Sequence, residues 1–225
     1  MTAFYTVGPV LFMGNLVYFE QKPQFYTCFY ADGTSKQCNL QEICSSEASS
    51  LVKWEVDTSV PYLRNLITDL GITCTSKLEI GLIGSMYFLG EAFMSFGYML
   101  YVRRVTGMMS RLKHLQVRNL IMAVVLTILV SWVRSLPLLY LCVFLIGAGQ
   151  AVQIIQGYTY LIESMPFKHR NIVSTIVAMI DKVILVSTTL ALKYQDDSNW
   201  VTIMVPGLFF AFFATLHSLF LLDSP

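Results

Sequence analysis

Three charged side chains lie near the middle of long apolar stretches of this sequence. Glu91 lies in an apolar run over residues 78–102, and the neighbours Asp181 and Lys182 lie in another over residues 172–192. A charge at the centre of a bilayer costs about 2.5–3.5 kcal/mol on insertion scales, so such groups normally face a polar cavity or a charged partner. A carboxylate in a cavity would attract an organic cation or carry a coupling proton. The alternative is an internal ion pair, such as Lys182 with Glu91, that only fixes helix packing.

Neutral polar side chains occupy comparable positions in two other apolar runs. Asn15 lies in the first run, and three glutamines recur at every third residue of the fourth. This spacing places Gln150, Gln153 and Gln156 on one slowly drifting stripe of a helix. The stripe could line a pore or join helices by hydrogen bonds. The candidate residues of a substrate path are Asn15, Glu91, Gln150, Gln153, Asp181 and Lys182.

The segments that carry these residues are long enough to cross a membrane. Of 225 residues, 55% are hydrophobic and only 13% are charged, whereas a soluble domain averages about 25% charged residues. A spanning helix needs about 20 apolar residues, and six runs are candidates: 3–19, 78–102, 119–133, 136–162, 172–192 and 201–222. We therefore predict an all-α membrane protein with six transmembrane helices in a lipid bilayer. The first run could instead be a signal peptide, but it lacks the basic region that such a signal needs.

Two short connections between the runs are basic. The connection over residues 103–118 contains five Arg or Lys residues and no acid, and the connection over residues 163–171 contains Lys168, His169 and Arg170. Short basic loops stay in the cytoplasm. One orientation satisfies both connections, with the amino and carboxyl termini in the cytoplasm and the long loop over residues 21–77 outside. The membrane could be the plasma membrane or an endomembrane.

The outer loop contains four of the five cysteines. Cys28, Cys38, Cys44 and Cys74 lie in this loop, which predicts two disulfides with three possible pairings. A zinc site is the rival interpretation, but the spacings lack a C-x-x-C pair and the compartment would be oxidising. Cys142 lies alone in the fourth run and is expected to be a small apolar residue at a helix interface.

Other function classes leave no pattern in the sequence. It has no glycine-rich G-x-x-x-x-G-K-[ST] phosphate loop and no motif that arranges serine, histidine and an acid. Three histidines are too few and too scattered for a metal site, and a net charge of +1 argues against a nucleic-acid partner. We expect neither enzymatic activity nor a cofactor or metal.

Four features resemble one family of transporters. The first is the cysteine-bearing loop with its central Trp54. The second is the stretch FGYMLYVRRVTGMMSR, which stands where that family has a G-x-x-x-D-R-x-G-R-R loop. The third is ESMPFKHR, which resembles the family's Glu, Pro and Arg at the end of the fourth helix, and the fourth is LLDSP, which resembles its E-S-P-R motif. The chain thus resembles the N-terminal half of a major facilitator superfamily transporter, closest to the organic cation and anion transporters.

The resemblance implies two six-helix bundles around a substrate path, each bundle made of two three-helix repeats. Residues 1–225 would form the N-terminal bundle, and its partner would be the absent C-terminal half or a second copy. The implied function is secondary transport of a small organic solute, such as an organic cation or another polar metabolite, by alternating access with a coupling ion. The implied cytoplasmic gate would contain Gly97, Arg103, Arg104, Glu163 and Arg170.

Two departures from the family pattern affect that gate. Tyr101 stands where the family has an acidic residue, and Val143 stands where it has an arginine ahead of Gly147 and Gly149. The gate is therefore rebuilt, weakened or absent. The alternative function is a non-transporting membrane assembly or receptor-like protein that keeps the half-bundle.

Overall fold

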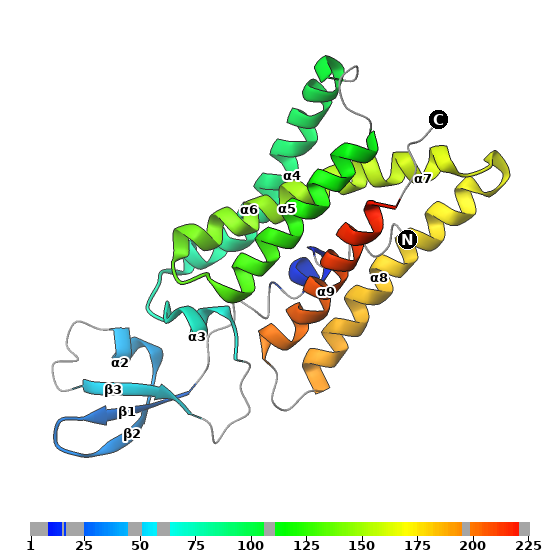
Figure 1. Cartoon of the computed structure of the whole chain (residues 1–225). Coiled ribbons are helices and arrows are strands. Elements are labelled where there is room, and N and C mark those ends of the chain that lie inside the picture. Colours follow the sequence, from blue (N-terminus) through cyan, green and yellow to red (C-terminus); the bar gives the residue numbers. More distant parts are fainter. Residues whose placement is uncertain are drawn as a thin grey trace.

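The computed structural model describes residues 9–14, 16, 25–44, 51–57, 64–105, 111–194 and 199–220. Most of them are helical, and the strands that the structure describes belong to the segment that precedes the second apolar run. Long helices form the body of the molecule, and a small sheet projects from one end of it (Figure 1).

Five described helices are long and apolar enough to cross a membrane. They comprise α4 (Lys77–Val105), α5 (Arg111–Ser131), α6 (Leu136–Val152) with its continuation α7 (Tyr158–Ser164), α8 (Arg170–Tyr194) and α9 (Trp200–Ser218). This number fits a helical, multi-pass membrane protein. The expected first helix, over residues 3–19, lies mostly outside the described residues.

Local sequence explains where the helices begin and end. The Ser76 hydroxyl accepts a hydrogen bond from the Glu79 N–H and the Glu79 carboxylate accepts one from the Ser76 N–H, a capping box that starts α4. The Asn199 side chain caps α9 by accepting the Val201 N–H at 3.1 Å. Helix α7 ends at Ser164, and Met165 is extended, because Pro166 disfavours helical backbone at the residue before it.

The connection between α4 and α5 is shorter than the sequence suggested. We expected a connection over residues 103–118, but α4 continues to Val105 and α5 already begins at Arg111. The adjoining ends of α4 and α5 and the turn between α7 and α8 lie at the end of the bundle remote from the sheet (Figure 1). The two basic connections are therefore adjacent to the same end of the bundle.

Helices α4 and α6 pack with their backbones in direct contact. A Cβ atom on Gly90 would collide with the Phe144 carbonyl oxygen, and one on Gly147 would collide with the Tyr87 carbonyl oxygen. Only glycine allows this approach, and close packing is what holds helices together in lipid. The buried core extends from this contact to α5 and α9 and includes Phe12, Ile83, Leu126, Leu139, Cys142, Val143, Ile146 and Met204.

The expected outer loop contains a small folded unit. Strands β1 (Tyr26–Tyr30), β2 (Ser35–Cys38) and β3 (Leu51–Val56) form an antiparallel sheet in the order β2-β1-β3, and the short helices α2 (Leu40–Cys44) and α3 (Leu66–Leu70) follow β2 and β3. The Tyr26 ring is buried against Trp54, and burial raises the pKa of the Tyr26 phenol to about 12.

Two disulfides hold this unit together and attach it to the bundle. Cys28 pairs with Cys38 within the sheet, with a Cα–Cα distance of 5.9 Å. Cys44 pairs with Cys74 at 5.3 Å and so joins α2 to the segment just before α4. The structure thus selects one of the three possible pairings and confirms the expectation of two disulfides.

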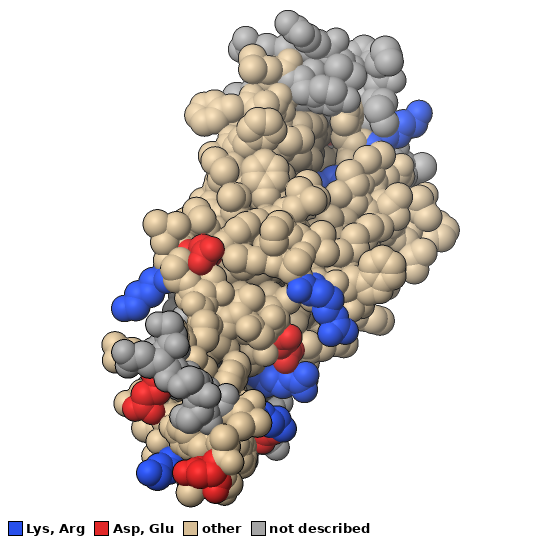
Figure 2. Space-filling view, turned by 90° about the vertical axis from the view of Figure 1, so that its left-hand side faces the viewer, with Lys and Arg blue, Asp and Glu red and all other residues tan. Residues whose placement is uncertain are grey.

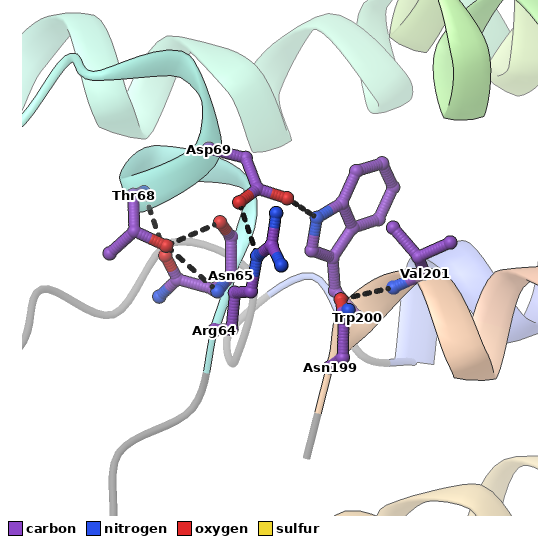
Figure 3. Close-up of polar contacts among 7 residues, drawn as sticks. All are labelled: Arg64, Asn65, Thr68, Asp69, Asn199, Trp200 and Val201. Atoms are coloured by element: carbon purple, nitrogen blue, oxygen red, sulfur yellow. Dashed lines mark hydrogen bonds and ion pairs between the residues drawn. The ribbon is translucent and has the colours of Figure 1, made fainter. Parts of the chain in front are cut away.

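A polar cluster fixes the start of α9 against α3 (Figure 3). The Trp200 indole donates to one Asp69 carboxylate oxygen at 2.8 Å, and the Arg64 guanidinium donates to the other at 2.7 Å. The Trp200 backbone N–H also donates to the Arg64 carbonyl oxygen at 3.1 Å. Because 131 residues separate Asp69 from Trp200, this cluster closes the bundle at its sheet end.

Charged side chains are distributed unevenly over the surface. Figure 2 shows most of the visible Lys, Arg, Asp and Glu side chains over the lower half of the molecule, a broad uncharged surface above them, and basic side chains again near the upper right. Exposed apolar side chains cover the helices, among them Phe93 and Phe96 of α4 and Phe209 of α9. This is the surface expected of helices that face lipid.

Candidate functional site

A cavity of about 630 Å³ lies among the helices that carry the charged candidates. Its walls come from the helical residues 9–14, from α4, from α6 with its continuation, and from α8. The lining residues are Val10, Met13, Tyr87, Glu91, Gln150, Ile154, Tyr158, Ala178, Asp181, Lys182 and Leu185. The volume falls within the range of about 300–1,000 Å³ that is typical of small-molecule sites.

Four of the six predicted substrate-path residues line this one cavity. Glu91 comes from α4, Gln150 from α6, and Asp181 and Lys182 from α8. Asp181 is half-buried and Lys182 is exposed. Adjacent helical residues point about 100° apart, yet both belong to the lining. The two remaining candidates lie elsewhere: Gln153 is buried outside the lining, and Asn15 falls outside the described residues.

Gln150 supplies a polar atom that is not satisfied by the described residues. Its side chain is only 8% exposed, and its amide oxygen accepts no hydrogen bond from them. A buried acceptor without a partner costs about 1–3 kcal/mol. Gln150 thus adds a buried amide to the wall of the cavity.

A π-helical turn over Gln153–Gly157 contains two of the three glutamines of the stripe. A π-helical turn shifts the angle at which later side chains leave the helix, and such turns are frequent at functional sites. Gln150 precedes the turn and lines the cavity, whereas Gln153 and Gln156 lie within it, buried and outside the lining. Tyr158 follows the turn and returns to the wall.

The cavity combines negative charge with aromatic rings. Two carboxylates, Glu91 and Asp181, against one ammonium group, Lys182, leave an excess of one negative charge in the lining. Tyr87 and Tyr158 add aromatic rings, whose faces attract cations. The lining therefore combines an excess of formal negative charge with aromatic surface.

The sequence argument missed the two tyrosines. Tyr87 lies four residues before Glu91 on α4, and this spacing places both side chains on one helix face. Tyr158 lies eight residues after Gln150, about two helical turns further along. The spacing from the polar candidates could have identified both residues, but tyrosines are common in the apolar runs and did not stand out.

The predicted gate residues lie at the bundle end remote from the sheet. Gly97 lies on α4, and Arg103 and Arg104 lie in its last turns, where the structure describes no side chains. Glu163 is exposed on α7. Arg170 donates to the Met165 carbonyl oxygen at 3.0 Å, and its guanidinium lies 5.7 Å from the centroid of the Phe167 ring. Both contacts stabilise the turn between α7 and α8.

One arginine takes an unexpected place. We placed Arg118 at the end of a cytoplasmic connection, with the alternative that residues 116–118 extend the third apolar run; it lies in α5 and is only 6% exposed. Its Nε donates to the Gly149 carbonyl oxygen at 2.9 Å, and its Nη1 donates to the Asn119 side-chain oxygen at 2.8 Å. The resemblance would place an arginine at Val143 of α6. The guanidinium that contacts α6 here belongs instead to Arg118 of α5.

The described residues form no cluster of three or more His, Cys, Asp or Glu side chains that could hold a metal ion. In comparisons with known proteins, no protein-family model matches the chain and no curated protein matches its sequence.

Proposed function

We propose that this chain moves a small organic cation across a membrane by alternating access, as a secondary transporter or as part of one. The observation that carries this proposal is the convergence of Glu91, Gln150, Asp181 and Lys182 on one cavity between apolar helices. Charges in the middle of spanning segments are costly and normally mark ion or substrate pathways.

Charge and geometry favour a cation as the transported solute. The carboxylates of Glu91 and Asp181 would balance a positive charge, and the rings of Tyr87 and Tyr158 would contact its apolar surface. Lys182 would serve as the internal counterion that keeps the empty cavity from carrying two unbalanced charges. A proton or another coupling ion would compete for the same carboxylates.

The resemblance to the major facilitator superfamily supports the same proposal at the level of the whole chain. In that arrangement the chain would supply the N-terminal bundle, and the C-terminal half or a second copy would close the path. The basic ends of the bundle favour termini in the cytoplasm and the disulfide-bonded unit outside. Gly97, Arg103, Arg104, Glu163 and Arg170 would then surround the cytoplasmic entrance.

A second candidate function is a non-transporting assembly or receptor-like protein. The observed contacts of Arg170 lie within its own turn, and Tyr101 and Val143 depart from the family pattern of the gate. A bundle without a working gate could still bind a ligand in the cavity. Both functions therefore predict that a ligand binds in the cavity, and only the transporter predicts that the ligand crosses the membrane.

Uptake by proteoliposomes separates these functions. Labelled tetraethylammonium and labelled choline are suitable probes, because both present a permanent cation. Glu91→Gln and Asp181→Asn each remove one negative charge, and each should lower uptake at least about tenfold, because a charge-assisted contact is worth about 1.5–3 kcal/mol.

Glu55→Gln is the matched control, because Glu55 lies on β3 in an exposed ion pair with Lys53, outside the cavity. This variant should transport like the wild type. Binding without uptake by the wild type would favour the receptor-like function. Uptake that is unchanged in both cavity variants would refute the assigned site.

A further inference from the structure

The two disulfides of this chain differ in how exposed they are. Cys28 and Cys38 form a buried disulfide, because the two residues are only 1% and 3% exposed. Cys44 and Cys74 form an exposed disulfide, because both residues are exposed. Thiol–disulfide exchange requires a thiolate to reach a sulfur atom, and exposed disulfides are therefore the labile and regulatory ones. The exposed disulfide is the one that an external thiol attacks more readily.

The exposed disulfide begins in a unit that has a core of its own. This sheet unit consists of β1, β2, β3 and α2. Its buried residues are Tyr26, Cys28, Cys38 and Ile43, and the side chains packed against them also come from these four elements. The buried disulfide lies within this core, so the sheet unit is closed covalently without help from the bundle.

The exposed disulfide ends on the bundle. Cys74 lies between α3 and α4, and α4 begins only three residues later, at Lys77. Helix α3 contributes Leu66 to the core of the bundle. Its Asp69 carboxylate also accepts the Trp200 indole N–H of α9 at 2.8 Å (Figure 3). The exposed disulfide therefore joins two parts of the molecule that have separate cores.

Without this disulfide, the polypeptide connections before β1 and after β3 would be the covalent links between the sheet unit and the bundle. Figure 1 shows the sheet unit projecting beyond the end of the helices. A crosslink between two segments restricts the arrangements that they can adopt relative to each other. Cleavage of the exposed disulfide would remove this restriction and leave the core of the sheet unit intact.

We propose that the exposed disulfide is a redox-sensitive tether, which a dithiol oxidoreductase cleaves to release the sheet unit from the start of α4. The buried disulfide stays closed and keeps the released unit folded. This proposal is independent of transport, because it concerns the position of the sheet unit and not the cavity.

The exchange proceeds in two steps. A thiolate of the oxidoreductase attacks the Cys74 sulfur, the bond between the two cysteine sulfurs breaks, and Cys44 leaves as a thiolate. The second thiol of the oxidoreductase, as a thiolate, then attacks its partner sulfur in the mixed disulfide and displaces Cys74. Two electrons and two protons pass from the oxidoreductase, which becomes a disulfide, to Cys44 and Cys74, which become thiols.

Differential alkylation of the full chain in detergent tests the selectivity. The protein is incubated with thioredoxin, thioredoxin reductase and NADPH, and samples are denatured in acid. New thiols are alkylated with one reagent, and the remaining disulfides are reduced and alkylated with another. Cys142 is a free thiol and serves as the internal reference. Cys44 and Cys74 should be reduced at least about tenfold faster than Cys28 and Cys38, because exchange depends on access to the attacked sulfur.

Spin labels on β2 and α5 test the movement. Ketone-bearing residues replace the exposed Lys36 and Ser131, so that labelling needs no new cysteine. The oxidised protein should give one narrow distance distribution by pulsed electron spin resonance, and this narrow distribution should be lost once the exposed disulfide is reduced. Hydrogen exchange should show that the amides of β1 stay protected.

A variant with Cys44→Ser and Cys74→Ser should give the broad distribution without reductant and should not respond to thioredoxin. Cys142→Ala is the control, because Cys142 lies in α6 and belongs to neither disulfide. It should respond like the wild type. If the double variant fails to fold, the wild type measured before and after reduction gives the same comparison.

Three results would overturn the proposal. Equal reduction rates for the two disulfides would exclude a selective target. An unchanged distance distribution after reduction of Cys44 and Cys74 would show that other contacts hold the sheet unit in place. Loss of amide protection in β1 after that reduction would mean that the exposed disulfide supports the fold of the unit instead of tethering it.

Discussion

Helices α6 and α8 are both apolar enough to cross a membrane, and the bundle uses them differently. Helix α6 packs on α4 through Gly90 and Gly147, where backbone meets backbone, and much of its surface is buried. Helix α8 presents apolar side chains outward along most of its length, namely Ile172, Ile176, Met179, Ile180, Val183, Val186 and Leu190. Its polar pair, Asp181 and Lys182, lines the cavity.

This difference shows that apolarity alone does not decide which helices form the core of a bundle. In lipid, an apolar side chain gains little by leaving the membrane for the protein interior, so small residues and buried polar contacts determine packing. Helix α6 has Gly147 at its contact with α4, whereas the sequence of α8 contains no glycine. We infer that α4 and α6 form the rigid frame and that α8 is the wall of the cavity that can move.

The largest expected effect comes from a substitution in the frame. Gly147→Leu places a side chain against the Tyr87 carbonyl oxygen. Backbone atoms cannot give way as a flexible side chain can, so α4 and α6 must separate. We expect no monodisperse folded protein after solubilisation, as measured by size-exclusion chromatography and circular dichroism, because overpacking costs about 1–3 kcal/mol even where the core can adjust.

Gly81→Leu is the matched control on α4. A Cβ atom at Gly81 has no neighbour within 4 Å, and the residue is exposed. This variant should fold and elute like the wild type. A folded Gly147→Leu variant would show that the contact between α4 and α6 is not the frame of the bundle.

The sequence predicts the class of the protein and the region of its cavity for clear physical reasons. Long apolar runs leave helices as the main way to satisfy the backbone in lipid, and charges inside such runs are too costly to be placed at random. Glu91, Asp181 and Lys182 therefore stand out as candidates by their positions in the apolar runs alone. The expectation of two disulfides followed from four cysteines that lie in one segment between two apolar runs.

Other features depend on contacts that spacing does not encode. The pairing of Cys44 with Cys74 requires α2 to lie beside the start of α4, and three pairings were equally compatible with the sequence. Arg118 looked like part of a basic connection because its burial depends on where α6 places the Gly149 carbonyl. Gln153 and Gln156 lie in a π-helical turn, for which the sequence gives no clear indication.

Substitutions at one valine of α6 and one valine of α8 compare how tightly the two helices are packed. Val143 on α6 is 0% exposed, and Val183 on α8 is 65% exposed. Val143→Ala leaves a void in the packed core and should lower the free energy of unfolding by about 2 kcal/mol. Val183→Ala removes the same two methyl groups from the outer surface and should change it by less than about 0.5 kcal/mol.

Chemical denaturation of the two variants in the same detergent gives both values. Equal losses would mean that α8 is as tightly packed as α6, which would exclude the division into frame and wall. A large loss of unfolding free energy for Val183→Ala alone would mean that α8 is packed more tightly than α6.

The smallest expected effect is a difference in the rate of thiol modification along α8. Ala178 lines the cavity, Val183 lies outside its lining, and Ala151 is buried in α6. Each is changed to cysteine and treated, in liposomes, with a charged methanethiosulfonate that does not enter lipid. The four cysteines of the segment that contains the sheet are in disulfides and Cys142 is buried, so the wild type should give a low background.

We expect Ala178→Cys to react at least about tenfold faster than Val183→Cys or Ala151→Cys, because modification requires a hydrated thiolate. Tetraethylammonium should slow the reaction at position 178 if it binds beside Asp181, since the bound cation would occupy the space that the reagent needs. Equal rates at positions 178 and 183 would mean that both faces of α8 meet the same environment. The polar pair would then need an explanation other than a water-filled cavity, and the case for α8 as the mobile wall would lose its basis.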